Sequence, residues 1–238
     1  MGLRNKKVFV TGASRGIGRA IAQAFRDEGA WVVGASTGSG GKADKQCDEW
    51  IQANFTSMPE IERCAGRIRE VQPDVLINNA GTNKNAPFLE ISPDVFRLIQ
   101  QVNVYAPFLL CQAALPAMKS RGWGRIVNIS SIFGKISMAH RASYSASKFA
   151  LDGMTVALAA EFAVHGILAN SVAPGFIDTD LTQRMLGASG IAALTAKVPA
   201  GRLGSVEEIA RLVVWLGGME NTFVSGQNIA IDGGFTRV

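Results

Sequence analysis

Three residues of this chain have the types and spacing needed for proton transfer. Tyr144 and Lys148 stand four residues apart at the start of a helical pattern, and Ser131 precedes Tyr144 by thirteen residues. Positions i and i+4 share one face of a helix, so the ammonium would lie near the phenol and favour its ionised form. Lys148 is therefore predicted to lower the pKa of Tyr144 from about 10, which would make it an acid and base, with Ser131 bonding the same substrate oxygen. The spacing is common by chance, and a surface tyrosine covering a lysine stem is the alternative.

Composition narrows the class of protein before any motif is considered. The chain has 238 residues, 47% hydrophobic and 18% charged, which predicts a single globular unit of soluble type. It shows no uninterrupted apolar run of 18 residues, no signal-peptide pattern and no paired cysteine spacing, so we expect a cytoplasmic protein without a metal site. The net charge of +5 is spread along the chain, which does not indicate nucleic-acid binding.

A glycine-rich turn between a strand and a helix predicts a binding site for a dinucleotide. Residues 7–11 are apolar, Gly12, Ser14, Arg15, Gly16, Ile17 and Gly18 form the turn, and a helical pattern runs from Arg19 to about Glu28. Glycines leave room for a phosphate, and the amide groups and dipole at a helix N-terminus favour anions. The spacing is Gly-x3-Gly-x-Gly, and a tight connection without a ligand is the alternative.

The next strand favours NADP over NAD. Residues 31–35 are followed by Ser36 and Thr37, where NAD-binding chains place a carboxylate for the ribose. Arg15 could pair with a 2′-phosphate and Thr37 could assist, although Arg15 could equally point to solvent. Residues 38–48 are expected to form an abbreviated crossover. A third strand at 50–54 would bring Asn54 and Phe55 to the adenine.

The remaining elements bring the other candidates to one edge of a sheet. Helices are expected at 57–71, opened by a capping box of Ser57 and Glu60, from Ser92 with Asn103 in the middle, at 143–164 and at 206–216. Strands are expected at 74–81, 124–131, 168–173 and 227–231. This alternation predicts an α/β fold, a single-domain doubly wound parallel sheet of Rossmann type, with about seven strands and helices on both faces. Asn79, Ala80, Gly81 and the loop from Pro174 and Gly175 then join the glycine turn at the carboxyl edge, and residues 181–200 suit a substrate flap.

Taken together these motifs resemble the short-chain dehydrogenase/reductase family. The resemblance rests on Thr11-Gly12-x3-Gly16-x-Gly18, residues 78–81 (Asn-Asn-Ala-Gly), Asn103, Ser131, Tyr144, Lys148 and Pro174-Gly175, and it covers essentially the whole chain. Residues 11–18, 173–180 and 198–204 look most like bacterial 3-oxoacyl-[acyl-carrier-protein] reductases.

The resemblance implies an NADP(H)-dependent oxidoreductase that interconverts a ketone and a secondary alcohol. It implies a tetrad in which Tyr144 delivers the proton, Ser131 holds the carbonyl oxygen, Lys148 also binds the nicotinamide ribose, and Asn103 positions a water. Ile177 and Thr179 would contact the nicotinamide side. A 3-oxoacyl-carrier reductase and a non-catalytic protein that senses NADP(H) are the two alternatives.

Two features bear on substrate and partners. The carrier-protein reductases that the chain resembles have basic residues at two positions that are His165 and Gly122 in this chain, and Arg121 stands only next to the second of them. The difference weakens the case for acyl carrier protein as a partner. Lys135, His140 and Arg141 could instead bind a polar or anionic small substrate, or could be solvated loop residues.

The helix after Lys148 is apolar on nearly all its faces, which predicts a partner subunit and agrees with the tetramers common in the family. A tetramer or a dimer is therefore expected, and a helix deeply buried within a monomer is the alternative.

Overall fold

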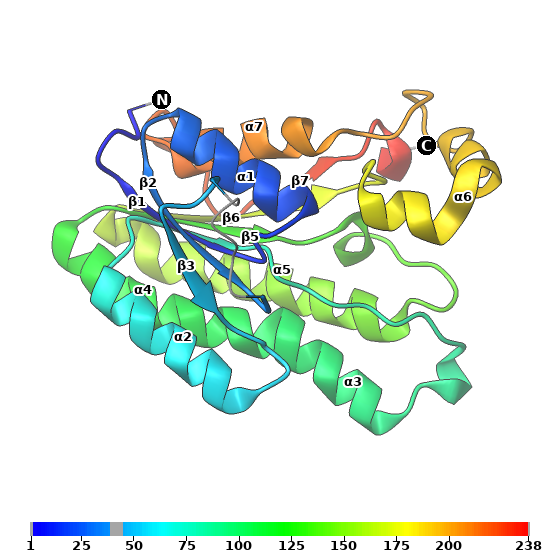
Figure 1. The fold of residues 1–238 in the computed structure, drawn as a ribbon, viewed down its shortest axis with the longest axis horizontal. Helices are drawn as coiled ribbons and strands as arrows, with labels where there is room; N and C mark the ends of the chain where they lie inside the picture. The colour runs from blue at the N-terminus through cyan, green and yellow to red at the C-terminus, as the bar shows by residue number, and fades with distance from the viewer. Residues whose placement is uncertain (1, 39–44, 238) are drawn as a thin grey trace.

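Seven parallel strands form one continuous sheet, whose order explains where a ligand can bind. The computed structural model describes residues 2–38 and 45–237, with the side chains of 181, 184–186 and 188 left aside. The order is β3-β2-β1-β4-β5-β6-β7, so the chain starts in the centre, builds outward to β3, and returns to build the other half from β4 (Figure 1). The strands are β1 (Lys7–Thr11), β2 (Trp31–Ser36), β3 (Glu49–Gln52), β4 (Val75–Asn78), β5 (Gly124–Ile129), β6 (Ile167–Pro174) and β7 (Asn228–Ile231). Successive strands are added towards one edge of the sheet from β1 to β3 and towards the other edge from β4 to β7. Ligands of open α/β sheets bind beyond the carboxyl ends of the strands where this order reverses, here between β1 and β4.

Helices cover both faces of this sheet. Figure 1 shows α1 (Gly16–Asp27) and α7 (Val206–Gly217) on one face, and α2 (Met58–Val71), α4 (Ala106–Arg121) and α5 (Ala142–Phe162) on the other. α3 (Pro93–Gln100) continues into α4 through a π-helical segment, η2 (Gln101–Tyr105), while α6 (Asp180–Thr195) stands beyond the carboxyl edge. Short 3-10 turns are η1 (Phe88–Glu90), η3 (Ile132–Gly134), η4 (Ala163–His165) and η5 (Phe235–Arg237). The predicted parallel α/β sheet with two helical layers is confirmed.

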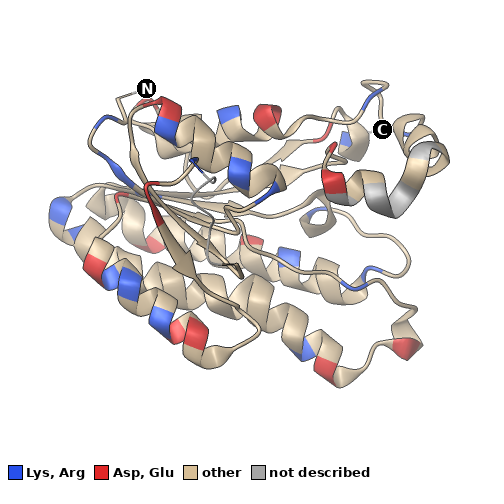
Figure 2. Ribbon diagram, in the orientation of Figure 1, with Lys and Arg blue, Asp and Glu red and all other residues tan. Residues whose placement is uncertain are grey.

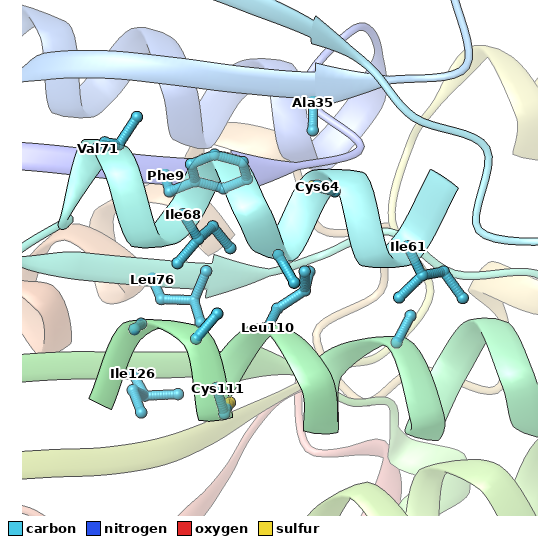
Figure 3. Packing of buried hydrophobic residues seen from close by; sticks show 14 of the residues in the cluster. Phe9, Ala35, Ile61, Cys64, Ile68, Val71, Leu76, Leu110, Cys111 and Ile126 are labelled. Carbon is cyan, nitrogen blue, oxygen red and sulfur yellow. The ribbon is translucent and has the colours of Figure 1, made fainter. Parts of the chain in front are cut away.

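The alternation of side chains along each strand produces two separate cores. Phe9 of β1 and Val33 of β2 point towards α2 and α4, whereas their neighbours Val8 and Val32 point towards α1 and α7. Both faces are buried, which is why the strands read as nearly continuous runs of Val, Ile and Ala. Figure 3 shows the first core, in which residues of the sheet meet α2 and α4: Phe9, Ala35, Ile61, Cys64, Ile68, Val71, Leu76, Leu110, Cys111 and Ile126.

A chain of buried polar side chains ties four elements together beneath the carboxyl edge. The Asn78 amide donates to Asn128 Oδ1 at 2.8 Å, Asn128 donates to Thr155 Oγ1 at 2.8 Å, and Thr155 lies 2.9 Å from Ser171 Oγ. These groups belong to β4, β5, α5 and β6 and are almost fully buried. Buried hydrogen-bond chains of this kind favour one arrangement of the elements around them, although Asn78 Oδ1 has no partner among the described residues.

Several boundaries differ from the sequence-based expectations for local reasons. α1 begins at Gly16 rather than Arg19, and Ser57 makes no side-chain cap to α2. The Ser57 amide already donates to the Asn54 carbonyl in a turn, so the Glu60 carboxylate accepts from the Asn54 amide instead, at 2.8 Å. The predicted capping box is therefore wrong. Of the predicted crossover at 38–48, residues 39–44 lie outside the described residues.

One helical stretch is long and apolar enough to be considered as a membrane span, although its apolar residues do not form an uninterrupted run. Pro93–Arg121, comprising α3, η2 and α4, reaches a mean hydropathy of 1.2 over 18 residues, and 56% of that window is buried inside the fold. A core helix of a soluble protein passes the same test, so the finding is weak evidence for a membrane span.

Candidate active site

The turn between β1 and α1 has the backbone shape that an anion site requires. Gly12 and Gly16 have φ angles of +67° and +52°, which side chains disfavour. A Cβ on Gly18 would lie 2.2 Å from the Gly12 carbonyl oxygen, so only glycine allows α1 to start this close to the turn. Ser14 and Arg15 are exposed on the outer side of the turn, and the first turn of α1 contains no acidic residue. The N-terminus of α1 is thus an uncompensated positive end facing the carboxyl edge.

The loop after β4 is locked onto this turn by two side chains. The Asn79 amide donates to the carbonyl oxygens of Thr11 and Gly12 at 2.9 and 3.2 Å. Thr11 Oγ1 in return accepts from the backbone amides of Asn79 and Ala80, both at 2.9 Å. The Asn79 side chain thus joins the loop after β4 to the end of β1. From the sequence Thr11 was named only as part of the glycine motif, without a role of its own.

Residues predicted to meet an adenosine end lie beyond β2 and β3. Thr37 is exposed directly after Ser36, which ends β2, and no carboxylate follows within the described residues up to Gly38. Asn54 is half-buried and its Oδ1 accepts from the amide and hydroxyl of Thr56. The Phe55 ring packs in the core beside α2 and α4, so only its backbone faces the edge of the sheet. A ring contact from Phe55 to an adenine therefore has no support here.

The loop after β6 forms the opposite wall. A Cβ on Gly175 would lie 2.7 Å from Asp232 Cα, which explains the glycine after Pro174. Ile177 is buried and bridges to Gly204, and Thr179 caps α6 by accepting from the Thr182 amide at 3.1 Å.

This wall lies close to the glycine turn and continues into a broken helix. A Cβ built on Gly16 would lie 3.8 Å from Thr179 Cγ2. Residues predicted as a flap form the helix α6, interrupted at Gly187, whose φ and ψ are 61° and 179°.

Ser131, Tyr144 and Lys148 converge where β5 ends. Ser131 follows β5 and opens η3, accepting from the Phe133 amide at 3.1 Å. The Lys148 ammonium is buried, donates to the Ile129 carbonyl at 2.8 Å and lies 5.5 Å from the centroid of the Tyr144 ring. Ser131 is close enough to the Tyr144 phenol to oppose the rise of its pKa. A proton donor, a second hydroxyl and a buried ammonium thus share one small volume.

Asn103 joins this group from the π-helical segment η2. Its Oδ1 accepts from the Thr82 amide at 2.8 Å, and its Nδ2 donates to the Thr82 carbonyl and to Ser147 Oγ, both at 2.9 Å. A Cβ on Gly81 would lie 3.4 Å from Asn103 Oδ1 and 3.7 Å from Lys148 Nζ, so the two side chains meet at that glycine. Both Nδ2 hydrogens of Asn103 are engaged and Oδ1 accepts one bond, so a water could bind the remaining lone pair of Oδ1 or the main-chain carbonyl. Sequence reasoning missed Ser147, the hydroxyl that connects Asn103 to α5.

Electrostatics at the phenol differ from the sequence-based hypothesis. Burial raises the pKa of Tyr144, opposed by the Ser131 hydrogen bond and by the Arg141 guanidinium. Burial lowers the pKa of Lys148 to about 8, opposed by the Asp152 carboxylate. The predicted lowering of the Tyr144 pKa by Lys148 is wrong for this structure, because the ammonium bonds a backbone carbonyl and the desolvation of the phenol dominates.

The basic residues considered for substrate or partner binding fall into two groups. Arg121 donates to the Pro73 carbonyl at 2.8 Å and pairs with Asp74 at 3.4 Å, so it is engaged within the chain. Lys135 and His140 are exposed, whereas Arg141 is half-buried beside Tyr144. No group of three His, Cys, Asp or Glu residues suited to a metal occurs in the part of the chain that the structure describes.

Known proteins match this chain over nearly its whole length. A family model described as enoyl-(acyl carrier protein) reductase matches residues 12–236. The 3-oxoacyl-[acyl-carrier-protein] reductase FabG of Salmonella typhimurium is 38% identical over 247 residues, covering 100% of both chains. A solved structure of a candidate NAD(P)-dependent gluconate 5-dehydrogenase from Beutenbergia cavernae, with NADP at low occupancy, is 34% identical with a TM-score of 0.94, covering 100% of this chain and 99% of that one. A candidate 2-deoxy-D-gluconate 3-dehydrogenase from Agrobacterium tumefaciens, with NADP bound, is 31% identical with a TM-score of 0.92, covering 100% and 98%.

Proposed function

The chain belongs to the short-chain dehydrogenase/reductase family of oxidoreductases, and from that premise we propose that it interconverts a ketone and a secondary alcohol with NADP(H). The observation that carries the proposal is the convergence of Ser131, Tyr144, Lys148 and Asn103 at the carboxyl edge, opposite the glycine turn. Each of these groups has a role in moving or guiding one proton.

The residues at the carboxyl edge fit a dinucleotide. A Cβ at Gly12 would lie 2.8 Å from Asn79 Nδ2 and one at Gly18 would lie 2.2 Å from the Gly12 oxygen, so only glycines allow a turn this tight, with its backbone free to approach a ligand. The turn amides would hold the pyrophosphate and Lys148 the nicotinamide ribose. When bound, the nicotinamide supplies or accepts the hydride.

Tyr144 then donates the proton to the carbonyl oxygen during reduction and removes it during oxidation. Ser131 holds the same oxygen in line, so both hydroxyls are aimed at the atom on which negative charge develops. The Asn103 carbonyl would hold a water that returns protons from solvent. The raised pKa of Tyr144 keeps the phenol protonated at neutral pH, which suits reduction.

NADP(H) is the proposed cofactor because the two described residues directly after β2, Thr37 and Gly38, are not carboxylates, while Arg15 is exposed at the glycine turn. A guanidinium can bind a 2′-phosphate through two parallel hydrogen bonds. Two similar solved structures contain NADP, which agrees with this reading.

Reduction of a 3-oxoacyl-carrier thioester is the second candidate activity, because the sequence relatives carry that name. Three of the solved structures are named for gluconate-type substrates, whereas another is named as a betaketoacyl-ACP reductase. Engagement of Arg121 by Pro73 and Asp74 leaves fewer free cations for an acidic carrier protein. We therefore favour a small substrate.

The deciding experiment follows the absorbance of reduced nicotinamide over a panel of ketones, alcohols and 3-oxoacyl thioesters with both cofactors. We expect turnover with NADP(H) and its loss in Tyr144→Phe, with NADP affinity retained. Turnover by Tyr144→Phe at the wild-type rate would remove Tyr144 from its role. NADP binding without turnover of any panel member by wild type would favour the sensor alternative.

We also propose that copies of the chain pair through α4 and α5. Figure 2 shows few charges along these helices, and Phe108, Phe149 and Val156 are 40%, 48% and 56% exposed. Apolar surface of this kind on neighbouring helices marks an interaction site. Light scattering should find a dimer or tetramer for wild type and a smaller species for Val156→Glu, and a monomeric wild type would contradict the proposal.

The three cysteines are free and buried, which agrees with our proposal that the enzyme works in the reducing cytoplasm.

A further inference from the structure

Arg141 occupies a position that is unfavourable for folding. It is the N-cap residue of the 21-residue helix α5, where it makes no side-chain cap, and the first turn of α5 has no acidic residue. Ser, Thr, Asp and Asn are the preferred N-caps, and the positive end of a helix repels a cation. The local structure therefore gives no reason for an arginine here.

The guanidinium of Arg141 lies over the aromatic ring of Phe133, which in turn lies next to the proposed catalytic Tyr144. Its Cζ lies 5.0 Å from the centroid of the Phe133 ring, whose centroid is 6.4 Å from that of Tyr144. Arg141 is half-buried, and within residues 2–38 and 45–237 its guanidinium makes no hydrogen bond and no ion pair, although its backbone carbonyl accepts from the Ser145 amide. A partly desolvated guanidinium normally has an anionic partner, so its five donors are available to a ligand.

The chain before Arg141 is held in an uncommon conformation. His140 has a φ angle of +67°, and its carbonyl accepts from the Ala86 amide at 3.3 Å, which joins this segment to the loop after β4. Backbone conformations of this kind persist at sites where the surrounding structure maintains them for binding. Here the turn directs Arg141 towards Phe133 and Tyr144.

We propose that Arg141 binds the carboxylate of a small oxo acid or hydroxy acid whose reacting carbon is held by Ser131 and Tyr144. The planar guanidinium matches a carboxylate with two parallel hydrogen bonds. Because guanidinium and phenol contact the same Phe133 ring, the carboxylate must stand only a few bonds from the carbonyl. A thioester with an aliphatic chain has no charge so close to its ketone. This assignment rests on the proposed oxidoreductase function and specifies its substrate class.

Matched pairs of substrates test the assignment. Linear oxo acids from 2-oxobutanoate to 5-oxohexanoate are compared with their methyl esters, using NADPH and wild type, Arg141→Gln, Arg141→Lys and the surface control Lys119→Gln. Wild type should prefer at least one acid over its ester, and Arg141→Gln should reduce that preference about 10- to 100-fold, mainly through KM. Arg141→Lys should restore part of it, and Lys119→Gln, exposed at the far end of α4, should leave it unchanged.

The ester serves as an internal reference, because any effect of Arg141 on the Tyr144 phenol changes both substrates alike. Arg141→Asn adds a readout of stability, since Asn is a preferred N-cap: its melting temperature should equal or exceed that of wild type while the acid preference is lost.

Equal use of acids and esters by wild type overturns the carboxylate assignment and leaves the oxidoreductase function intact. An equal loss for acid and ester in Arg141→Gln, with a lower melting temperature, also overturns it. A preference for phosphonate analogues over the acids would exclude a carboxylate as the natural group. Absence of turnover for every pair, with wild type equal to Tyr144→Phe, would contradict the proposed function itself.

Discussion

Replacing Lys148 by methionine should change the pH dependence of stability in a direction that the structure fixes. The ammonium is 4% exposed, and burial lowers its pKa from 10.5 to about 8. Between these values the unfolded chain binds more protons than the folded one, so wild-type stability gains with rising pH from this group. At about 1.36 kcal/mol per pKa unit, the cost of keeping the amine charged in the fold is about 3 kcal/mol at pH 7.

The methionine variant lacks this titration, so its stability relative to wild type should fall by about 2 kcal/mol between pH 7 and 9.5. Contributions that do not depend on pH, including the lost hydrogen bond to Ile129, cancel in this change. Urea unfolding of nucleotide-free protein at half-unit pH steps measures it, with Lys119→Met as the exposed control. Repeating the comparison in an Asp152→Asn background removes the nearest carboxylate that faces Lys148. A difference that stays constant over this range would refute the account of a desolvated ammonium.

Three further changes test the cofactor side of the site. Arg15→Ala should raise the KM for NADPH about 10-fold, because it removes one charge-assisted contact, and should change the KM for NADH little. Steady-state kinetics with both cofactors tests this, and equal effects on both would show that the 2′-phosphate is bound elsewhere. Gly18→Ala should abolish NADP binding in fluorescence titration, because its Cβ would lie 2.2 Å from the Gly12 carbonyl oxygen, and unchanged affinity would contradict the close approach. Thr11→Val should lower the free energy of unfolding by about 2 kcal/mol, because it leaves the Asn79 and Ala80 amides without their acceptor. Thr11→Ser keeps the hydroxyl and should largely retain stability, and urea unfolding of both variants measures the difference.

Much of this molecule follows from local pattern. Apolar runs ending in glycine or Asn turns, alternating with helical periodicity, predict the parallel sheet and the edge at which ligands bind. Ser131, Tyr144 and Lys148 stand out by type and spacing, whereas the role of Asn103 was implied by the family resemblance. These features are local in sequence or repeat with a period, so the chain displays them without tertiary information.

The energies of those groups were decided by tertiary contacts. The pKa of Tyr144 depends on burial and on Arg141 and Ser131, and Lys148 bonds Ile129, nineteen residues away, rather than the phenol one turn before it. The capping box at Ser57 does not form, since the Glu60 amide donates to the Ser57 carbonyl and the Ser57 amide donates to the Asn54 carbonyl. Sequence spacing specifies which groups can meet, whereas desolvation and competing hydrogen bonds depend on every element packed around them, and only the folded structure contains that information.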